Sequence, residues 1–434
     1  MSTPGKSHGP LIPLSRAQEL IRAEIVPLGV ERLALAEAHE RILAAPIAAA
    51  RDLPGSDISM MDGYALRAAD APGPLRVAFE VAAGDAPSPR GLEAGEAARI
   101  FTGAPLPPGA DCVAMQEQCE SEGDRVVLQR AAQAGQHLRR RGEEMRAGAA
   151  VLARGTLLGA AELSLAAGAG ATQVAVHARP RVAILATGDE LLPLGATPQP
   201  GQLVETNSLA LAQACREAGA VPLLLGISRD DPQEIAARLR AADADLLVTT
   251  GGASVGDHDH ASDALALLGG ALLFHGLAIR PGKPALCGLV DGGSRDAWDA
   301  NHRAGAAPSA APRARRLAFC LPGNPAASLL CFELLVRPAL RWLQGASSWE
   351  RPRARARLVQ ASLARVPGLT FFPRGRAVFR EGQLEFTPSG QQNSMQIGSW
   401  SAANAVAVIE PGGSASPSRI EAGEVLDVLL LRLD

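Results

Sequence analysis

The central part of the chain alternates between short apolar runs and stretches with helical spacing. RVAILATG (181–188), VPLLLGI (221–227) and ADLLVTTGG (244–252) are apolar runs of strand length. Between them lie NSLALAQACREAGA (207–220) and DPQEIAARLRAA (231–242), which carry apolar residues at the spacing of a helix. Strands that alternate with helices predict a parallel sheet that is covered by helices on both faces.

The residues before this α/β region show two different patterns. LSRAQELIRAEI (14–25) predicts a helix with Ser15 as its N-cap, because a serine hydroxyl can accept hydrogen bonds from exposed backbone N–H groups. VERLALAEAHERILA (30–44) fits both strand and helix spacing, so it stays open. Residues 51–140 are rich in Gly and Pro around short apolar stretches, which predicts a small β domain. Residues 141–178 return to Ala-rich helical character and are expected to rejoin the first zone.

The end of the chain adds two further segments. Residues 350–434 alternate apolar and polar positions, which predicts another small β domain. Residues 291–316 are of low complexity and poor in apolar residues, so they are predicted to be a disordered surface insertion. The predicted fold class is therefore multidomain α/β. Its domains are an elongated helical linker domain (8–50 and 141–178), an inserted small β domain (51–140), a parallel-sheet α/β domain (179–345) and a C-terminal β domain (350–434).

Composition and charge narrow the functional classes. The 434 residues are 47% hydrophobic and 20% charged, the balance of a soluble globular protein. A formal net charge of −3 and an aromatic content of 3% argue against nucleic-acid binding, which uses basic surfaces and aromatic stacking. The N-terminus has no signal-peptide core, and no apolar run reaches the ~20 residues of a membrane span. Six cysteines form no CxxC pair, so we expect no disulfides and a cytoplasmic protein.

A glycine-rich segment, TTGGASVGDHD (249–259), follows the last of the three predicted strands. Two of its glycines have the spacing of a phosphate-binding P-loop, but Asp257 stands where that loop has lysine. Its backbone N–H groups and the Ser254 hydroxyl suit an anion. Asp257 and Asp259 suit a hard cation such as Mg²⁺, which prefers carboxylate, water and phosphate oxygens.

Two other interpretations of this segment stay open at this point. The glycines can simply ease a tight turn, with an aspartate capping the next helix. His258 and His260 next to the aspartates also raise the possibility of zinc. Zinc usually needs three or four converging ligands, which one short loop does not supply, so Mg²⁺ is favoured over zinc.

Acidic residues follow the other predicted strands as well. Asp189 and Glu190 come after the first strand, Asp230 comes after the second, and Glu205 stands just before a helix. Because the carboxyl ends of parallel strands meet at one edge of a sheet, we expect these side chains to lie close together. Like charges that are close together are costly without a cation, so this edge predicts a Mg²⁺ site.

The same region has a basic counterpart. Arg280 and Lys283 flank the Pro-Gly turn of IRPGKP, and such a pair suits an oxyanion. LPGNPAAS (321–328) forms a second such turn before an apolar helix, whose N-terminus favours anions. Carboxylates for a metal and a basic anion pocket together predict chemistry on a phosphate with a second oxyanion, without naming the substrate.

Seven stretches in this order along nearly the whole chain resemble the molybdopterin molybdenumtransferase family, which is MoeA in bacteria and the E domain of gephyrin in animals. They are SDISMMDGYA (56–65), FTGAPLPPGAD (101–111), ATGDEL (186–191), VETNS (204–208), TTGGASVGDHD (249–259), RPGKP (280–284) and LPGNP (321–325). The resemblance implies a homodimer of four-domain subunits. Its implied substrates are adenylylated molybdopterin and molybdate, with Mg²⁺ as cofactor and release of AMP as molybdenum is inserted at the dithiolene.

The resemblance also assigns site residues. The implied catalytic residues are Asp57, Asp62, Thr102, Glu190, Asp230 and Asp259. The implied Mg²⁺ ligands are Asp189, Glu190, Asp230, Asp257 and Asp259. The implied substrate-binding residues are Ser59, Glu144, Gly251, Gly252, Ser254, Gly256, Arg280, Lys283, Pro284, Asn324 and Ser394. Those in the inserted β domain are expected to reach the active site of the partner subunit. Without the resemblance, Asp62 and Thr102 suit a turn and a cap equally well.

Four positions depart from the family pattern. Ile58 stands for a common Asn, Glu205 and Glu144 stand for Asp, and Ala327 stands for a common Ser. The two glutamates keep the charge. The hydrogen bonds lost at Ile58 and Ala327 are worth ~1 kcal/mol each, which weakens activity rather than abolishing it.

Other functions compete with this assignment. A molybdopterin adenylyltransferase shares the α/β domain, but its Gly-Gly-Thr-Gly is absent at GGASVG (251–256), and the other three zones argue against it as well. The resemblance separately makes such an enzyme a candidate partner. A non-catalytic molybdopterin-binding scaffold, or an impaired paralogue of the same family, is the alternative from a different class. The sequence favours neither molybdate nor tungstate.

Overall fold

The computed structural model describes residues 10–252, 260–291, 315–360, 362–412 and 417–432. Two compact units divide the chain. The larger unit combines Met1–Glu31 with Val176–Asp434, and the smaller unit is Arg32–Ala175. The insertion predicted as disordered lies outside the described residues, except for its ends.

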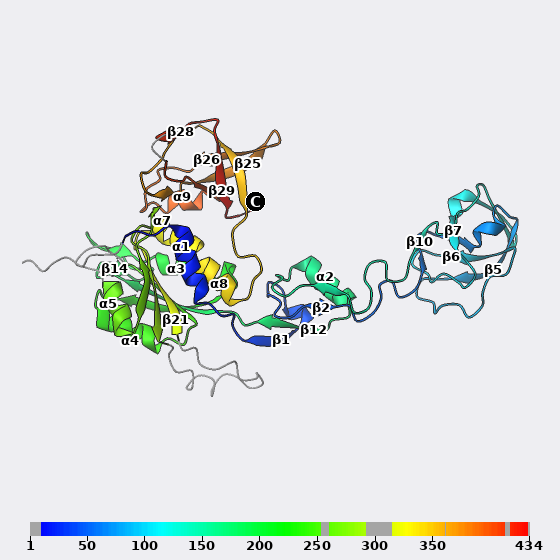
Figure 1. The fold of residues 1–434 in the computed structure, drawn as a ribbon, viewed down its shortest axis with the longest axis horizontal. Coiled ribbons are helices and arrows are strands. Elements are labelled where there is room, and N and C mark those ends of the chain that lie inside the picture. Colours follow the sequence, from blue (N-terminus) through cyan, green and yellow to red (C-terminus); the bar gives the residue numbers. More distant parts are fainter. Residues whose placement is uncertain (1–9, 253–259, 292–314, 361, 413–416, 433–434) are drawn as a thin grey trace, which may run out of the picture. The chain divides into compact units, whose positions relative to one another are not determined.

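A six-stranded sheet forms the centre of the α/β domain in the larger unit (Figure 1). Its strands, in spatial order, are β16 (Val221–Ser228), β13 (Arg181–Thr187), β17 (Leu246–Thr250), β21 (Arg315–Leu321), β20 (Leu286–Asp291) and β18 (Ala271–His275). The first four are parallel, as predicted, but β20 runs antiparallel to both of its neighbours, β21 and β18. The predicted parallel sheet is confirmed for these four strands, and β20 makes the complete sheet mixed. Only residues 276–285 join β18 to β20, which is too short for the helical crossover that parallel neighbours need.

Helices cover both faces of this sheet, as predicted. The helical segments are α3 (Asn207–Glu217), α7 (Pro325–Cys331), η4 (Phe332–Val336) and α8 (Arg337–Leu343) on one face, with α4 (Pro232–Ala241) and α5 (His260–Leu267) on the other. In β13, Val182 and Ile184 pack towards the first face, and Ala183 and Leu185 pack towards the second. A strand that is buried on both faces reads as a continuous apolar run, which is why RVAILATG could be recognised.

Helix α1 (Leu14–Ala23) packs into the core of the larger unit. Ala17 and Ile21, one turn apart on its apolar side, have no exposed surface and join the cluster that contains α8. The chain up to Glu31 therefore belongs to a different compact unit from residues 32–50, with which the sequence had grouped it. An amphipathic helix buries its apolar stripe against any core that can accept it, and sequence spacing does not reveal which core that is.

The predicted N-cap of α1 is wrong. The helix begins at Leu14, after Pro13, and no side chain caps it. Ser15 is already the second helical residue, so its hydroxyl is past the position from which it could accept the first free N–H groups.

A closed barrel forms the C-terminal domain, which confirms the predicted β domain. Its strands in order are β22 (Arg353–Leu358), β26 (Gln383–Pro388), β25 (Arg374–Arg380), β27 (Ala405–Val408) and β29 (Val425–Leu430). Phe386 is fully buried in the barrel core. The barrel also pairs with the α/β domain, because β24 (Thr370–Phe371) runs parallel to β19 (Ile279–Arg280). This pair brings the barrel next to the IRPGKP turn.

The smaller unit contains the other predicted β domain. Its six-stranded sheet has the order β7 (Cys112–Met115), β4 (Gly63–Leu66), β6 (Glu96–Ile100), β5 (Leu75–Val81), β9 (Arg125–Leu128) and β8 (Cys119–Glu122). Glycine and proline between these short strands make the turns that the sequence indicated. A separate two-stranded pair, β3 (Ile58–Ser59) with β10 (Leu138–Arg139), precedes and follows the sheet along the chain.

The expected helical linker is only partly helical. Its elements are β1 (Val30–Ala34), η1 (Leu35–Glu37), β2 (Ile47–Ala48), β11 (Ala150–Leu152), α2 (Ala160–Gly168) and β12 (Gln173–His177). β1 pairs with β12, and β2 pairs with β11. The prediction of helix across 141–178 is therefore wrong outside α2, since the alternating valines of β12 suit a strand better than a helix. The segment that stayed open, residues 30–44, begins as strand β1.

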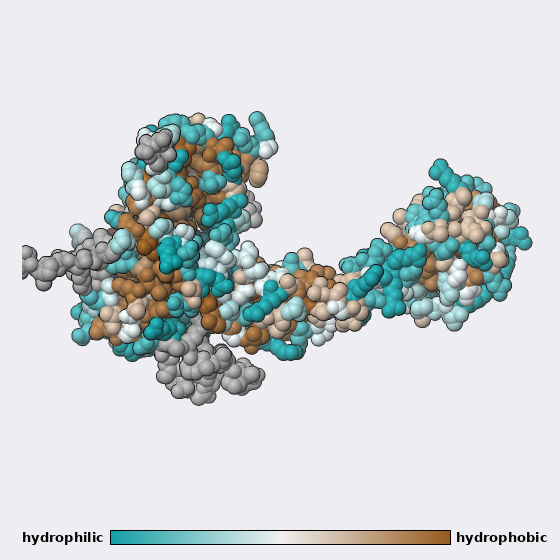
Figure 2. All heavy atoms as spheres, in the orientation of Figure 1, coloured by the Kyte–Doolittle hydropathy of each residue, from teal (hydrophilic) through white to brown (hydrophobic). Residues whose placement is uncertain are grey.

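The remaining short elements are η2 (Ala68–Asp70), η3 (Gln116–Gln118), β14 (Leu191–Leu192), β15 (Leu203–Val204), β23 (Leu363–Ala364), α9 (Gly398–Ser401) and β28 (Arg419–Ile420). On the face drawn in Figure 2, hydrophobic surface is interrupted by hydrophilic residues. Among the described residues, no helix is long and apolar enough to cross a membrane. All six cysteines are free thiols in the structure.

Candidate functional site

The carboxyl ends of the parallel strands bring the predicted polar residues together. β13 and β16 end side by side, with Thr187 opposite Ser228, and the Gly188 N–H donates a 3.2 Å hydrogen bond to the Ser228 carbonyl. Asp189 and Asp230 each lie two residues after one of these strand ends. The prediction that acidic strand ends share one edge of the sheet is therefore confirmed for these two strands.

Asp230 has the environment of a cation ligand. Its Oδ1 is buried and has no hydrogen-bond partner among the described residues. Burial raises the pKa of Asp230, the nearby charges of Asp189 and Glu190 raise it further, and the charge of His260 opposes this. A buried carboxylate oxygen without a donor, beside two other carboxylates, fits a hard cation such as Mg²⁺.

A cavity of about 480 Å³ lies at this edge of the sheet, and we call it the acidic cavity. Three carboxylates line it, from Glu190, Glu205 and Asp230. Its other lining residues are Thr187, Gly188, Leu191, Leu203, Val204, Thr206, Asn207, Thr250, Gly251, Gly252, Pro284, Pro322, Gly323, Asn324, Pro325 and Met395. Apart from Pro284, the apolar side chains among them were not predicted as site residues, and they give the cavity walls against which a planar ring could pack.

Glycines bring two backbone segments into close contact inside the acidic cavity. Gly251 has a positive φ of 96°, and a Cβ at this position would lie 2.1 Å from the carbonyl oxygen of Thr187. Gly252 also has a positive φ, and its Cβ would meet the Thr187 hydroxyl at 3.0 Å. Only glycine fits at Gly251, because both the space and the backbone conformation exclude a side chain.

Asn207 connects three segments at the cavity wall. Its Nδ2 donates 2.8 Å hydrogen bonds to Thr250 Oγ1, at the end of β17, and to the carbonyl of Gly323. Glu205, which replaces a common Asp, accepts a 2.8 Å hydrogen bond from the Ser208 N–H at the start of α3. Its extra methylene therefore still allows a capping contact. The VETNS motif thus holds the cavity wall and supplies one of its carboxylates.

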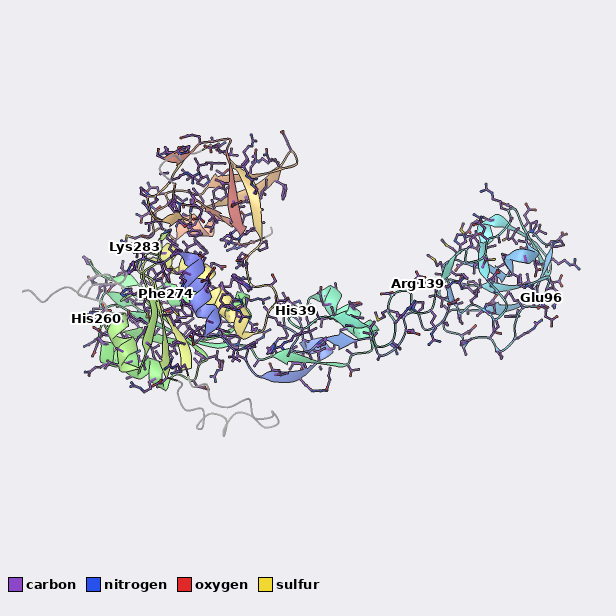
Figure 3. All side chains as sticks on the ribbon, viewed as in Figure 1. His39, Glu96, Arg139, His260, Phe274 and Lys283 are labelled. Carbon is purple, nitrogen blue, oxygen red and sulfur yellow. The ribbon has the colours of Figure 1, made fainter. Side chains whose placement is uncertain are left out.

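A second cavity, of about 720 Å³, adjoins the first, and we call it the basic cavity. Arg280, at the end of β19, and Lys283, in the turn between β19 and β20, line it. Figure 3 labels Lys283 at the end of the α/β domain nearest the C-terminal barrel. The Arg280 guanidinium lies 5.7 Å from the centroid of the Phe371 ring, a cation–π contact that fixes its position against the barrel.

Three residues line both cavities: Pro284, Pro322 and Asn324. The two cavities are therefore neighbours that meet at the LPGNP turn. Carboxylates line one of them, and cationic side chains line the other. Ala327, which replaces a common Ser, also lines the basic cavity, so it presents a methyl group where a hydroxyl would be a hydrogen-bond donor.

The C-terminal barrel completes the basic cavity with a segment that sequence reasoning largely missed. Ser394 was assigned to the site through the family resemblance, and it does line the cavity. Gln391, Gln392 and Asn393 line it too, although they were not predicted. A run of amides, QQNS, was the available signal, but it lies in a separate domain, and only the folded chain shows where it packs.

The smaller unit holds the other assigned residues. Asp62 accepts two 2.8 Å hydrogen bonds, from the backbone N–H and the hydroxyl of Thr102, and these lower its pKa. Asp57 accepts a 2.8 Å hydrogen bond from the Arg141 N–H and pairs with Arg140 at 2.6 Å, and its pKa is lowered, chiefly by that N–H. Both carboxylates are held in their charged form.

Two further assigned residues in the smaller unit, Ser59 and Glu144, make structural contacts, and so does Asp111. Ser59 is buried and donates a 2.6 Å hydrogen bond to the Met61 carbonyl, which shapes the turn in SDISMMDG. Glu144 forms a 2.5 Å ion pair with Arg139. Asp111, which was assigned no site role, accepts a 2.7 Å hydrogen bond from the Ala68 N–H and so holds the fold.

Four assigned residues lie outside the described residues: Ser254, Gly256, Asp257 and Asp259. The same is true of His258, on which the zinc interpretation partly depended. In the part of the chain that is described, no three His, Cys, Asp or Glu side chains are grouped as metal ligands. What fits a metal ion among the described residues is the environment of Asp230, with its unpartnered buried oxygen and its two neighbouring carboxylates.

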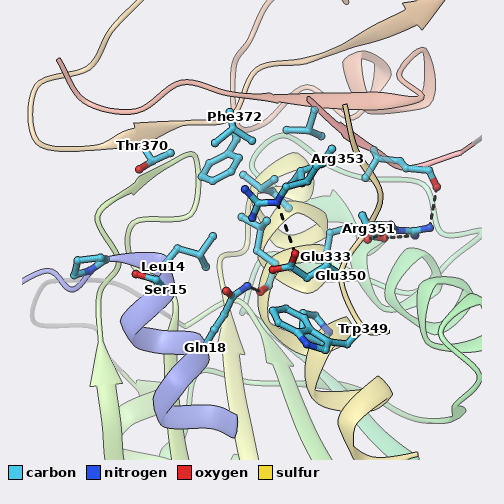
Figure 4. A pocket seen from close by; sticks show the side chains of 18 of the residues that line it. Leu14, Ser15, Gln18, Glu333, Trp349, Glu350, Arg351, Arg353, Thr370 and Phe372 are labelled. Atoms are coloured by element: carbon cyan, nitrogen blue, oxygen red, sulfur yellow. Dashed lines mark hydrogen bonds and ion pairs between the residues drawn. The ribbon is translucent and has the colours of Figure 1, made fainter. Parts of the chain in front are cut away.

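A third cavity, of about 280 Å³, lies between α1, the η4–α8 region and the barrel (Figure 4). Within it, Arg351 donates hydrogen bonds of 2.8 and 2.9 Å to the two carboxylate oxygens of Glu333. The ring centroids of Trp349 and Trp342 lie 4.7 Å apart, with the two ring planes tilted by 54°. These pairs hold the connector between α8 and β22 against the α/β domain, and none of the predicted site residues lines this cavity.

Comparison with known protein families covers nearly the whole chain. The family model described as "MoeA N-terminal region (domain I and II)" matches residues 12–170. The model described as "Probable molybdopterin binding domain" matches residues 183–342. The model described as "MoeA C-terminal region (domain IV)" matches residues 356–431. The match to residues 183–342 contains the motifs of the α/β domain that line the two cavities.

Relatives and solved structures agree with these matches. Molybdopterin molybdenumtransferase of Haemophilus influenzae is 32% identical, over 93% of this chain and 94% of its own length. The Nostoc enzyme of the same name is 39% identical, over 72% of this chain and 69% of its own. A crystal structure of the molybdopterin biosynthesis protein MoeA from Pyrococcus horikoshii superposes with a TM-score of 0.79 at 27% identity, covering 97% of this chain and all of that one. The chain therefore belongs to the molybdopterin molybdenumtransferase (MoeA) family.

Proposed function

We propose that the protein inserts molybdenum into molybdopterin during molybdenum cofactor biosynthesis. In the proposed reaction, adenylylated molybdopterin and molybdate enter the two neighbouring cavities. The two dithiolene thiols form bonds to molybdenum, and the oxygen ligand that they displace leaves as water with their protons. Water also hydrolyses the phosphoanhydride bond, which releases AMP. The observation that carries this proposal is the pair of cavities that share Pro284, Pro322 and Asn324, one lined by carboxylates and the other by cations.

The basic cavity supports the oxyanion part of the proposal. Arg280 and Lys283 offer a guanidinium and an ammonium to a tetrahedral dianion, and Arg can contact two of its oxygens at once. Asn324 and Ser394 add neutral donors from the two sides of the cavity. Since Asn324 also lines the acidic cavity, an oxyanion held here lies beside the ligand of that cavity.

The acidic cavity supports the phosphate part. Its backbone glycines allow close approach of a ligand to the chain at Gly251 and Gly252. Leu191, Leu203 and Met395 give apolar walls for a ring system. Asn207 and Glu205 hold the start of α3 at this wall, so the cavity has a fixed shape before any ligand binds.

Asp230, with Glu190 and Asp189 beside it, would hold Mg²⁺, together with Asp257 and Asp259 from outside the described residues. Bound there, Mg²⁺ stabilises the charge that develops on phosphate oxygens as the anhydride breaks. The structure supports this role for Asp230, because its buried Oδ1 has no hydrogen-bond partner among the described residues.

The finer parts of the proposal concern assembly and location. We infer a cytoplasmic homodimer in which Asp57, Ser59, Asp62 and Thr102 of one subunit act at the larger unit of the other. The charged carboxylates of Asp57 and Asp62 support such a role, since both are oriented by hydrogen bonds. A molybdopterin adenylyltransferase would supply the substrate and is the expected partner.

The test is AMP release from adenylylated molybdopterin, with and without Mg²⁺ and molybdate. Wild-type protein should release AMP only when both ions are present. Asp230→Asn should release it at least about 100-fold more slowly, since metal stabilisation of developing charge is worth several kcal/mol. Asp427→Asn, at an exposed position in β29, is the matched control and should behave as wild type. Tight molybdopterin binding without AMP release by wild-type protein would instead support a non-catalytic scaffold.

A further inference from the structure

The wall that the C-terminal barrel adds to the basic cavity consists of four consecutive polar residues, Gln391 to Ser394. Each of their side chains carries both an oxygen that can accept a hydrogen bond and a group that can donate one. Which of the two a ligand meets depends on the hydrogen bonds that these side chains already make within the protein. In all four, an internal donor bonds to the oxygen.

Backbone N–H groups fix the orientation of two of the amides. The N–H of Met395 donates a 3.1 Å hydrogen bond to Asn393 Oδ1. The N–H of Arg374 donates a 2.8 Å bond to Gln392 Oε1, and Gln392 Nε2 donates in turn to two backbone carbonyls at 2.9 Å. Because a backbone N–H can only donate, both amides must turn their oxygens towards it. The Asn393 Nδ2 group bonds to no described residue, so it remains a donor for a ligand of the cavity.

The other two side chains of this wall accept internal hydrogen bonds as well. Ser394 Oγ accepts a 3.0 Å bond from Asn324 Nδ2, and its own O–H can then donate to a ligand. Gln391 Oε1 accepts a 3.4 Å bond from Gln396 Nε2. Among the described residues, no carboxylate lines the basic cavity, and Asn324 Oδ1 is the only lining side-chain oxygen that receives no hydrogen bond. The basic cavity therefore offers mainly donors to a ligand.

We propose that this arrangement makes the basic cavity selective for oxyanions that carry no proton, so that it rejects phosphate. The inference rests on the proposed function, in which this cavity holds molybdate. Molybdate, tungstate and sulfate are fully deprotonated at neutral pH, so every one of their oxygens accepts hydrogen bonds. Phosphate keeps at least one proton, and its P–OH group must donate. Between Arg280, Lys283 and the donors of the barrel wall, that group meets no charged acceptor.

The proton is costly because it removes two hydrogen bonds. The P–OH group loses the acceptor that water gave it, and the N–H or O–H group that faces it loses an anionic oxygen. Sulfate and monohydrogen phosphate have the same tetrahedral shape and the same charge, so a comparison of these two anions isolates the effect of the proton. Sulfate should bind to the cavity roughly 10- to 100-fold more tightly than phosphate.

The test measures AMP release at varied molybdate and saturating adenylylated molybdopterin, with sulfate or phosphate as the inhibitor. The buffer is mildly alkaline, so that phosphate is a dianion with one proton. Sulfate should compete with molybdate, and the inhibition constant of phosphate against molybdate should be roughly 10- to 100-fold higher. This comparison uses wild-type protein, so it does not depend on the folding of any variant.

Asn393→Asp reverses the chemistry of one group at the wall. Aspartate keeps the oxygen that the Met395 N–H contacts and replaces the Nδ2 donor by a charged acceptor, so the Tm should stay near the wild-type value. The KM for molybdate should rise by roughly 10- to 100-fold, because a donor is lost and a negative charge is added. The ratio of the inhibition constants of phosphate and sulfate should fall by at least about tenfold, because the P–OH group gains an acceptor.

Two control variants separate the acceptor from other effects. Asn393→Ala removes the donor without adding an acceptor, so it should raise the KM for molybdate by about fivefold and leave phosphate the weaker inhibitor. Gln383→Glu makes the same change from amide to carboxylate at an exposed position at the start of β26, which lines neither cavity. It should change neither the KM nor the ratio.

The outcomes separate this inference from the proposed function. If molybdate does not stimulate AMP release by wild type, the assignment of the basic cavity to an oxyanion is wrong. If release depends on molybdate but phosphate competes as strongly as sulfate, only the selectivity is overturned. A ratio that stays unchanged in Asn393→Asp would overturn the role of the barrel wall, whatever the change in KM.

Discussion

Asn324 and Ser394 join the α/β domain to the C-terminal barrel at the place where the two cavities meet. Asn324 Nδ2 donates a 3.0 Å hydrogen bond to Ser394 Oγ, and the Ser394 carbonyl accepts a 3.0 Å bond from the Ala326 N–H at the start of α7. Asn324 lines both cavities, whereas Ser394 lines only the basic one. The two side chains should therefore affect the two substrates differently.

Ser394→Ala should raise the KM for molybdate and leave the KM for adenylylated molybdopterin unchanged, whereas Asn324→Ala should raise both. One neutral hydrogen bond is worth ~1 kcal/mol, so each effect should be about fivefold. In the double variant, the two effects on the KM for molybdate should be non-additive by about 0.5 to 1.5 kcal/mol, because the two residues share one hydrogen bond. Additive effects would mean that the pair does not act together at the cavity.

The sequence was sufficient to predict the acidic edge of the sheet, and the reason is geometric. Asp189 and Asp230 each follow an apolar run of strand length, and parallel strands place their carboxyl ends together. Nothing beyond the order of strands and helices was needed to expect these charges in one place. The structure adds what spacing does not contain, which is that Asp230 Oδ1 is buried without a partner among the described residues.

Contacts between segments that lie far apart in sequence could not be predicted in the same way. Arg374 reads as one more exposed charge in an alternating strand, yet it is fully buried. The burial of α1 against α8 likewise depends on a core built by residues more than 300 positions away. Ser394 was found only through the family resemblance. Local pattern determines an element, whereas its partner is determined by tertiary packing.

Asp230→Asn should stabilise the metal-free protein at neutral pH. The pKa of Asp230 is raised above its ordinary value of 3.8, mainly by burial and then by Asp189 and Glu190. Below pH 3.8 the carboxyl is protonated in both states and costs nothing; as the pH rises to its folded-state pKa, ionisation increasingly destabilises the wild type. The Tm of Asp230→Asn should therefore exceed that of wild type above this window and match it below.

Saturating Mg²⁺ should reverse the order of the Tm values of wild type and Asp230→Asn. Because Mg²⁺ binds only the ionised carboxylate of the folded protein, saturating Mg²⁺ should raise the Tm of wild type and have a smaller effect on Asp230→Asn. Asp427→Asn, on the exposed side of β29, should show neither effect. A Mg²⁺-induced shift in Tm that is equal in wild type and Asp230→Asn would remove Asp230 from the metal site.

Gly251→Ala should disrupt the acidic cavity. The added Cβ would lie 2.1 Å from the Thr187 carbonyl, and the φ of 96° is unfavourable for any side chain. Backbone must move to relieve this contact, so we expect a lower Tm and at least about tenfold less activity. Gly195→Ala is the matched control, since its φ is 89° but nothing lies within 4 Å of its Cβ. Equal losses in both variants would assign the effect to backbone strain rather than to the contact.

Mixed dimers test whether two subunits share each active site. Asp62→Asn damages the smaller unit, where Asp62 is oriented by two bonds from Thr102, and Asp230→Asn damages the larger unit. If each site combines the larger unit of one subunit with the smaller unit of the other, a purified heterodimer of the two variants has one fully native site. It should recover about half of the wild-type activity per dimer, although each variant alone is inactive.

The control for this experiment is a heterodimer of Asp62→Asn with Asp57→Asn. Both changes lie in the smaller unit, so every shared site contains one damaged contribution, and no activity should return. If instead each site is built within a single chain, the Asp62→Asn and Asp230→Asn heterodimer also contains no intact site. Recovery in the first pair and none in the second is therefore expected only of sites shared across a dimer, and a chain that stays monomeric in sedimentation would contradict the arrangement directly.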